Sequence, residues 1–258
     1  IQSLRVVTKL ESKYSDFDGL NLMFETREGI LKHCSKINAP KLGDVAKRFL
    51  SGSAPTLEAQ VTDLGDAIAY TCHDIEDGVK SGLISSETLM ASDLFARLWK
   101  SVETRKPGLS EKHKLQETLR DLMGTLVKGV ISQTRRNISE LGLMSLDDVR
   151  ARGHEVVNLP PELLVEHRTL KSLMFKILYH HPVVIKTTSE ATNIIGTLFD
   201  LYVENPSLMQ QNLSTTISIP RQVSDYISGM TDRYAMRAYE SALNIRNVEN
   251  ISGLCSAS

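Results

Sequence analysis

The 258-residue chain is poor in aromatic side chains, which make up 5% of it, and it has a single tryptophan. It also lacks any apolar run near the roughly 18–20 residues that a membrane-spanning helix needs. Its three cysteines, Cys34, Cys72 and Cys255, are odd in number and far apart, which argues against a disulfide framework. No secretory signal pattern opens the chain. These absences predict a cytoplasmic protein with no membrane segment.

An excess of charge of either sign is missing as well. The chain has 30 basic and 31 acidic residues, for a formal net charge of −1. Proteins that bind nucleic acid non-specifically need a basic excess, so the charge balance gives no indication of such a partner. Hydrophobic residues make up 41% of the chain and charged residues 24%, which is enough to build a sizeable core.

The first residue is also informative. Ile1 is not a methionine, and the helical pattern of Leu4, Val7 and Leu10 begins with no capping residue ahead of it. We therefore expect a chain that is incomplete at its N-terminus.

Apolar residues recur with the 3.6-residue period of an α-helix along most of the sequence, and strand signals are poor. Prolines and glycines fall mostly between the periodic runs. The pattern predicts an all-α fold in a single domain. Its expected helices are 2–14, 21–38, 41–51, 56–83, 86–90, 91–104, 110–140, 145–152, 160–180, 185–205 and 221–244.

The predicted helix within residues 57–83 carries many polar side chains along one face. At 100° per residue, apolar positions such as Val61, Ile68 and Ile75 form an ordinary core stripe. The other side collects carboxylates, a phenol and an imidazole: Asp63, Asp66, Tyr70, His73, Asp74 and Asp77. Spacing alone favours a solvated acidic face. A shortage of basic partners one turn away, and the aromatic residues within the stripe, favour a ligand site instead.

This helix resembles the signature of bacterial dGTPase-like HD-domain triphosphohydrolases. The matching residues are Leu57-Glu58-Ala59-Gln60-Val61, Leu64, Asp66, Ile68-Ala69-Tyr70, His73-Asp74 and Asp77-Gly78. Other segments resemble the family in order and spacing: 2–7, 17–22, 25–33, 170–181 and 225–234. The resemblance implies an HD-domain-like helical bundle over residues 1–245, without its N-terminal portion. The small and polar residues at the end of the chain predict a disordered tail over 246–258.

The resemblance also implies roles for individual residues. In this family a metal is held by a His, a His-Asp pair and a later Asp. The last of these matches Asp66, with Asp63 as a nearby alternative. Tyr70 and Asp74 match residues that contact the deoxyribose, and the Asp accepts a hydrogen bond from the 3′-hydroxyl. Tyr179 matches the wall that leaves no room for a ribose 2′-hydroxyl.

Two further matches lie toward the end of the predicted helix 160–180. Lys171 matches a basic position that pairs with the triphosphate, and on an α-helix it lies about 80° from Tyr179, so both can face one cleft. His181 is placed to reach phosphate or base. Without the resemblance, Tyr179 and His181 would be interpreted as a capped helix end. The remaining histidines with no ligand spacing are expected at the surface or at helix ends: His113, His154, His167 and His180.

The implied reaction is hydrolysis of a dNTP such as dGTP to deoxynucleoside and inorganic triphosphate. Mg²⁺, Mn²⁺ or another transition metal would assist attack of water on the α-phosphate. By the resemblance, the family's first metal His, its His-Asp pair and a catalytic His would all precede Ile1. His73-Asp74 is not that pair, which lies on a different helix. We therefore identify no catalytic residue, and we expect this chain alone to be inactive, since one ligand binds a divalent metal weakly.

Two other functions stay open. The first is a non-catalytic helical module that assembles with itself or senses nucleotides; family members form homo-oligomers, and the surface around residues 86–140 offers an interface. The second is an HD phosphodiesterase, which shares the metal chemistry but does not need Tyr70, Asp74 and Tyr179.

Overall fold

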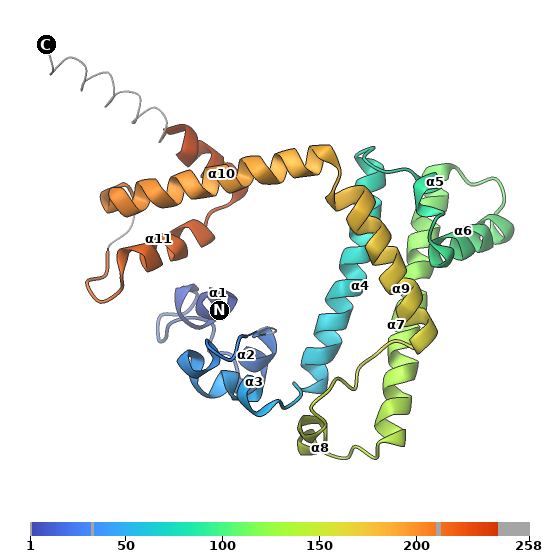
Figure 1. The fold of residues 1–258 in the computed structure, drawn as a ribbon, viewed down its shortest axis with the longest axis horizontal. Helices are drawn as coiled ribbons and strands as arrows, with labels where there is room; N and C mark the ends of the chain where they lie inside the picture. The colour runs from blue at the N-terminus through green and yellow to red at the C-terminus, as the bar shows by residue number, and fades with distance from the viewer. Residues whose placement is uncertain (1, 32–33, 210–212, 242–258) are drawn as a thin grey trace, which may run out of the picture. The chain divides into compact units, whose positions relative to one another are not determined.

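The structure is a computed structural model that describes residues 2–31, 34–209 and 213–241. Every regular element in these ranges is a helix, and no β-strand occurs in them (Figure 1). The prediction of an all-α fold is confirmed. Over the same ranges, no helix combines the length and the apolar character needed to cross a membrane.

The chain divides into two compact units, Ile1–His181 and Pro182–Ser258. Each unit has its own buried side chains, and each is described separately below. The expectation of one helical domain over residues 1–245 stays a prediction. The tail expected over 246–258 lies outside the described residues.

Five helices of the first unit begin where the sequence supplies a capping side chain. The elements are α1 (Gln2–Arg5), η1 (Val6–Leu10), α2 (Phe24–Ile30), η2 (Ala39–Ala46), α3 (Lys47–Ser51), α4 (Leu57–Lys80), α5 (Ser86–Leu89), α6 (Asp93–Arg105), α7 (Glu111–Glu140), α8 (Leu146–Ala151), α9 (Pro161–Met174) and η3 (Phe175–Tyr179). The hydroxyl groups that accept a backbone N–H at a helix start belong to Thr56, Ser85, Ser92, Ser110 and Ser145. Such caps typically stabilise a helix by about 1 kcal/mol.

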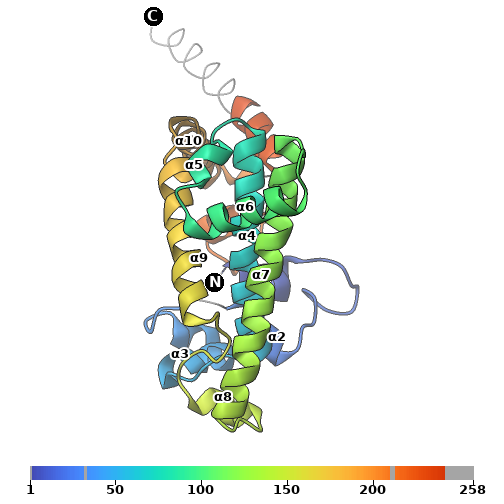
Figure 2. The ribbon, with the colours of Figure 1, turned by 90° about the vertical axis from the view of Figure 1, so that its right-hand side faces the viewer.

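The long helices α4, α7 and α9 run alongside one another (Figure 2). Helix α4 packs on α7, and α6 packs on both α7 and α9. The buried stripe of α4 contains Ile68, Cys72 and Ile75, and α7 buries Leu122 and Leu126. Burying one such side chain stabilises the fold by about 1.5–3 kcal/mol, so this packing fixes the face that α4 turns to solvent.

The core stripe of α4 is shorter than the sequence pattern predicts. Val61 was expected within it but is 49% exposed. The first turns of α4 pack on α2 through a different face, where the position of a Cβ on Gly29 would lie 3.2 Å from the Cβ of Ala59. Val61 points away from that contact, so its side chain stays in solvent.

A buried glutamine fastens the start of α4 to the segment that leads into α9. Gln60 is 4% exposed, and its side-chain oxygen accepts the backbone N–H groups of Val156 and Val157 at 2.7 and 3.0 Å. Its amide nitrogen donates to the carbonyl of Pro55 at 2.8 Å. Buried amide groups lose free energy when unpaired, so these bonds hold the two segments in one register.

Some of the predicted helices are interrupted in the structure. The helix expected over 21–38 is α2, which ends at Ile30, and turns follow within residues 34–38. The helix expected over 160–180 changes from α-helical to π-helical geometry at Phe175. A π-helical turn holds one more residue per hydrogen-bonded turn, and a 3.6-residue apolar pattern does not reveal it.

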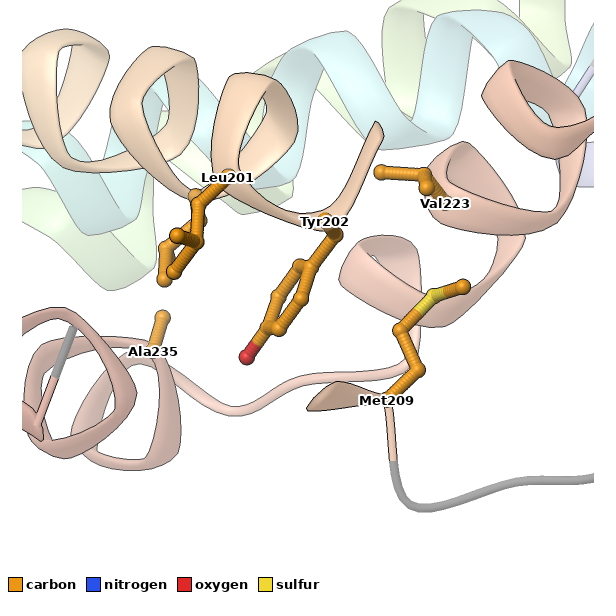
Figure 3. Close-up of a cluster of buried hydrophobic side chains, with 6 residues drawn as sticks. Leu201, Tyr202, Met209, Val223 and Ala235 are labelled. Atoms are coloured by element: carbon orange, nitrogen blue, oxygen red, sulfur yellow. The ribbon is translucent and has the colours of Figure 1, made fainter. Parts of the chain in front are cut away.

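The second unit packs around the C-terminal half of α10 (Pro182–Glu204), with η4 (Pro206–Leu208), α11 (Ile219–Ser228) and helical residues 232–241. Figure 3 shows its core, made of Leu198, Leu201, Tyr202, Met209, Val223 and Ala235. The helix expected over 221–244 breaks near Gly229. The hydroxyl of Thr231 then accepts the backbone N–H of Tyr234 at 3.3 Å and caps the next helix.

A pair of glycine substitutions in α4 tests this packing. A Cβ on Gly78 would lie 2.9 Å from the Cδ1 of Ile84 and 3.2 Å from the Cδ1 of Leu178, whereas a Cβ on Gly65 meets nothing within 4 Å. We expect Gly78→Val to lower the free energy of unfolding by about 1–3 kcal/mol through overpacking. Gly65→Val should leave it unchanged or raise it by a few tenths of a kcal/mol, because valine is the better helix former. Urea unfolding followed by circular dichroism measures both; equal stability of the two variants would contradict the packing described.

Candidate functional site

A cavity of about 400 Å³ lies in the first unit between α4 and the continuous arm formed by α9 and η3. Its polar lining consists of Asp63, Asp66, Tyr70, Thr71, Asp74, Lys171 and Tyr179. Ala67 and Met174 complete the lining. The volume is within the range of about 300–1,000 Å³ that is usual for small-molecule sites.

Helix α4 presents the acidic wall of this cavity. Asp66, Tyr70 and Asp74 are spaced four residues apart, so they stack along one face of the helix, on the side away from its buried stripe. Tyr70 is 61% exposed and Asp74 is half-buried. The wall is therefore open to solvent and accessible to a ligand.

The α9–η3 arm supplies the opposite wall through Lys171 and Tyr179. The Tyr179 hydroxyl donates a short hydrogen bond to Oδ2 of Asp74, which joins the two walls directly. Burial, followed by this bond to a negative carboxylate, raises the pKa of Tyr179 to about 12. The phenol is therefore a hydrogen-bond donor at neutral pH and carries no charge.

A second hydrogen bond joins the walls behind the cavity. The Nε2 of His167, on α9, lies 3.1 Å from the hydroxyl oxygen of Thr71, on α4. The Thr71 hydroxyl donates its one proton to the carbonyl of Ala67 at 2.9 Å. It must then accept from the imidazole, so the Nε2 of His167 carries a proton.

The environment of His167 differs from the one predicted. The sequence placed this histidine at the surface or a helix end, but it lies within α9 and is 2% exposed. Its spacing from Lys171 shows no ligand pattern, and its partner lies 96 residues away, so a local pattern could not reveal the contact. Burial, and then the charge of Lys171, lowers the pKa of His167 to about 4.

The predicted site residues are brought together with one exception. Asp66, Tyr70, Asp74, Lys171 and Tyr179 all line the cavity, and so does the alternative Asp63. His181 follows η3 and is not among the lining residues. Thr71 and His167 were not among the predicted site residues, because only the three-dimensional structure brings them together. His73 lies at a separate groove with Gln116 of α7.

Curated relatives match most of the chain. A deoxyguanosinetriphosphate triphosphohydrolase-like protein of Azoarcus sp. (strain BH72) is 46% identical over 241 residues, covering 93% of this chain and 63% of that protein. Proteins of the same name from Thiobacillus denitrificans and Geobacter sulfurreducens are 40% and 39% identical over 250 and 243 residues. This chain is a relative of the dGTPase-like proteins. The resemblance inferred from its motifs is confirmed.

The match to these dGTPase-like proteins is partial in length. The chain spans less than two thirds of each: 63% of the Azoarcus protein, 66% of the Thiobacillus protein and 63% of the Geobacter protein. In addition, residues 157–241 match the family model of the phosphohydrolase-associated domain, a segment that includes Lys171 and Tyr179. Both comparisons relate this chain to proteins that are named triphosphohydrolase-like or that contain a phosphohydrolase-associated domain.

The dGTPase-like resemblance implies a divalent metal at Asp66. Within the described residues, no three His, Cys, Asp or Glu side chains are grouped so that they can hold an ion. Asp63 and Asp66 offer carboxylates, but no imidazole lines the described cavity. Catalytic metal sites in proteins generally use three protein ligands, so these residues do not form a complete metal centre.

The buried histidine gives a testable dependence of stability on pH. The folded-state pKa of His167, about 4, is below its ordinary value of 6.5, so the unfolded chain binds the proton first. The resulting stability is fully present above about pH 6.5 and is lost as pH falls toward 4. By linkage the loss is about 3 kcal/mol.

Comparison with His167→Gln isolates this effect. The glutamine retains an N–H donor for Thr71 but does not titrate, so the free energy of unfolding should fall less between pH 6.5 and 4 than in the wild type. His154→Gln, at an exposed position, is the control for loss of a histidine. Urea unfolding across this pH range measures the difference, and parallel curves for wild type and His167→Gln would contradict the assigned environment.

Proposed function

We propose that this chain forms the nucleotide-binding wall of a deoxynucleoside triphosphate triphosphohydrolase. In that reaction water adds to the α-phosphorus, the bond from this phosphorus to the 5′-oxygen breaks, and the 5′-oxygen takes up a proton. The products are a deoxynucleoside and inorganic triphosphate. One observation carries the proposal: the cavity collects the family-matched residues Asp66, Tyr70, Asp74, Lys171 and Tyr179.

The sugar is assigned to the part of the cavity between Asp74 and Tyr179. A carboxylate has two oxygens, and Tyr179 occupies only Oδ2 of Asp74, so the other oxygen can accept a 3′-hydroxyl. The ring of Tyr179, held by the same bond, closes the sugar edge where a 2′-hydroxyl would project. Tyr70 lies one turn before Asp74 on the same face and offers a further contact to the sugar.

The phosphates are assigned to Lys171, the cation of the cavity lining. Three carboxylates, Asp63, Asp66 and Asp74, also line the cavity, so its described wall carries more negative than positive charge. A triphosphate is repelled by such a wall unless cations accompany it. This supports a role for divalent metal bound with the substrate, with Asp66 as the ligand this chain contributes.

The chain is not expected to hydrolyse dNTPs by itself. A single matched ligand at Asp66 does not hold a divalent metal tightly, and the described residues supply no imidazole beside it. Binding of nucleotide and hydrolysis are therefore separate properties, which need separate measurements.

The metal assignment is tested with two aspartates of α4. Asp66 lines the cavity and Asp77 does not, although both are exposed on one helix. In a form of the protein that hydrolyses dNTPs, we expect Asp66→Asn to reduce the release of inorganic triphosphate by about 100-fold or more, because it removes a ligand of the metal that would stabilise charge at the reacting phosphate. Asp77→Asn should retain wild-type activity.

Activity is assayed with each dNTP and Mg²⁺ or Mn²⁺. The assay uses the chain and, if the coding sequence extends beyond it, the longer protein. Hydrolysis that is equally impaired in both variants, or in neither, counts against Asp66 as a ligand. If neither the chain nor the longer protein hydrolyses a dNTP but either hydrolyses a phosphodiester, the phosphodiesterase alternative is favoured.

Discrimination against ribose is tested at Tyr179. The preference for dGTP over GTP in equilibrium binding should fall about 10-fold in Tyr179→Ala, because the ring that excludes the 2′-hydroxyl is lost. Tyr179→Phe keeps the ring and should keep the preference, although it loses the bond to Asp74. A Tyr179→Ala variant that still prefers dGTP to the same extent would remove Tyr179 from the sugar wall.

A further inference from the structure

A second cavity lies in the first unit, where α2, α3 and α8 meet. Its volume is about 330 Å³, and it shares no lining residue with the cavity between α4 and α9. Basic and hydroxyl side chains surround most of it. Neither the proposed hydrolysis nor the family-matched substrate residues make use of this cavity.

One of its arginines is already neutralised. Glu28 of α2 is 1% exposed, and both oxygens accept hydrogen bonds from the guanidinium of Arg150 on α8, at 3.3 and 2.9 Å. Such a bidentate pair satisfies the carboxylate on both sides. The charges of Glu28 and Arg150 therefore cancel within the cavity wall.

The other arginine, Arg48, is less fully neutralised. Arg48 donates from Nη2 to the carbonyl of Leu31 at 2.7 Å, and its Nε is buried without a hydrogen-bond partner in the described part of the chain. No ion pair of Arg48 occurs there either. Burial is the main cause that lowers the pKa of Arg48; Glu28 raises it, and the neighbouring Arg150 lowers it further. Both oxygens of Glu28 are already bonded to Arg150, so Glu28 balances the charge of Arg48 only in part.

More donors stand at the same opening. Lys47 pairs with Asp44 at 2.8 Å, but both side chains are about three-quarters exposed, and an exposed pair of this kind separates at little cost. The hydroxyls of Ser51 and Ser53 contact each other at the rim of the cavity. One guanidinium, one ammonium and two hydroxyls thus converge on one space.

We propose that this cavity is a binding site for a phosphate-type anion, with the half-buried Arg48 as the main charge partner and Lys47, Ser51 and Ser53 as further donors. A tetrahedral oxyanion has enough oxygens to accept from all four groups, whereas a carboxylate has two. The cavity residues comprise three cations and two carboxylates, so one bound negative charge balances them. The site is separate from the nucleotide cavity and does not depend on the function proposed for it.

Inorganic phosphate and pyrophosphate are the probes, and the backbone amide NMR signals of Gly52 and Ser53 are the readout, with calorimetry for affinity. We expect saturable shifts at these two amides. Lys47→Ala and Ser53→Ala should each weaken binding about 10-fold, the usual effect of losing a charge-assisted hydrogen bond. Lys41→Ala, an exposed lysine outside the cavity, and Lys171→Ala, in the other cavity, should bind as the wild type does.

Arg48→Lys adds a test that keeps the positive charge in place. It should fold as judged by circular dichroism but bind pyrophosphate more weakly, because an ammonium cannot reproduce the guanidinium fork. No saturable shift with either probe, or binding that is lost in Lys171→Ala but kept in Lys47→Ala, would overturn the proposal. In the Lys171→Ala variant, competition of dGTP with pyrophosphate is measured. Competition shows that the second cavity takes the phosphate of a nucleotide, and its absence shows that the cavity takes free phosphate.

Discussion

Three polar contacts along α4 determine the positions of the two walls of the cavity between α4 and the α9–η3 arm. The contacts are Gln60 with Val156 and Val157, Thr71 with His167, and Asp74 with Tyr179. They are spread over fourteen residues of helix, or about 21 Å. Each joins α4 to the chain that leads into, forms or follows α9. Hydrogen bonds are directional, so they define the rotation and the register of the two walls in a way that apolar contacts do not.

Apolar packing does a different job in the same unit. Ile68, Cys72 and Ile75 bury one side of α4 against its neighbours, and this leaves Asp66 and Asp74 on the side that faces the cavity. A stripe of this kind tolerates small shifts along the helix axis, since hydrophobic attraction has no preferred direction. The buried Thr71–His167 contact removes that freedom, because a shift would leave a desolvated imidazole N–H without an acceptor.

Periodicity and spacing were sufficient to predict the all-α fold and the acidic face of α4. The same reasoning could not find His167, because its partner is distant in sequence, and it placed Tyr179 on an α-helix that is π-helical there. Of the family-matched positions, five line one cavity in the structure, and His181 does not. Motifs record which residues act together, whereas caps, π turns and buried polar pairs depend on three-dimensional packing.

The hydrogen bond from Tyr179 to Asp74 changes what a ligand hydroxyl gains by binding there. The carboxylate of Asp74 already accepts a hydrogen bond from the protein, so it is not an unpaired acceptor before a ligand binds. A hydroxyl that takes the place of the phenol exchanges one hydrogen bond for another of similar strength, and the net free energy is small. A hydroxyl that fits beside the phenol adds a bond without breaking one. The Tyr179–Asp74 contact therefore favours ligands whose hydroxyl fits beside the phenol, and it contributes more to shape selectivity than to affinity.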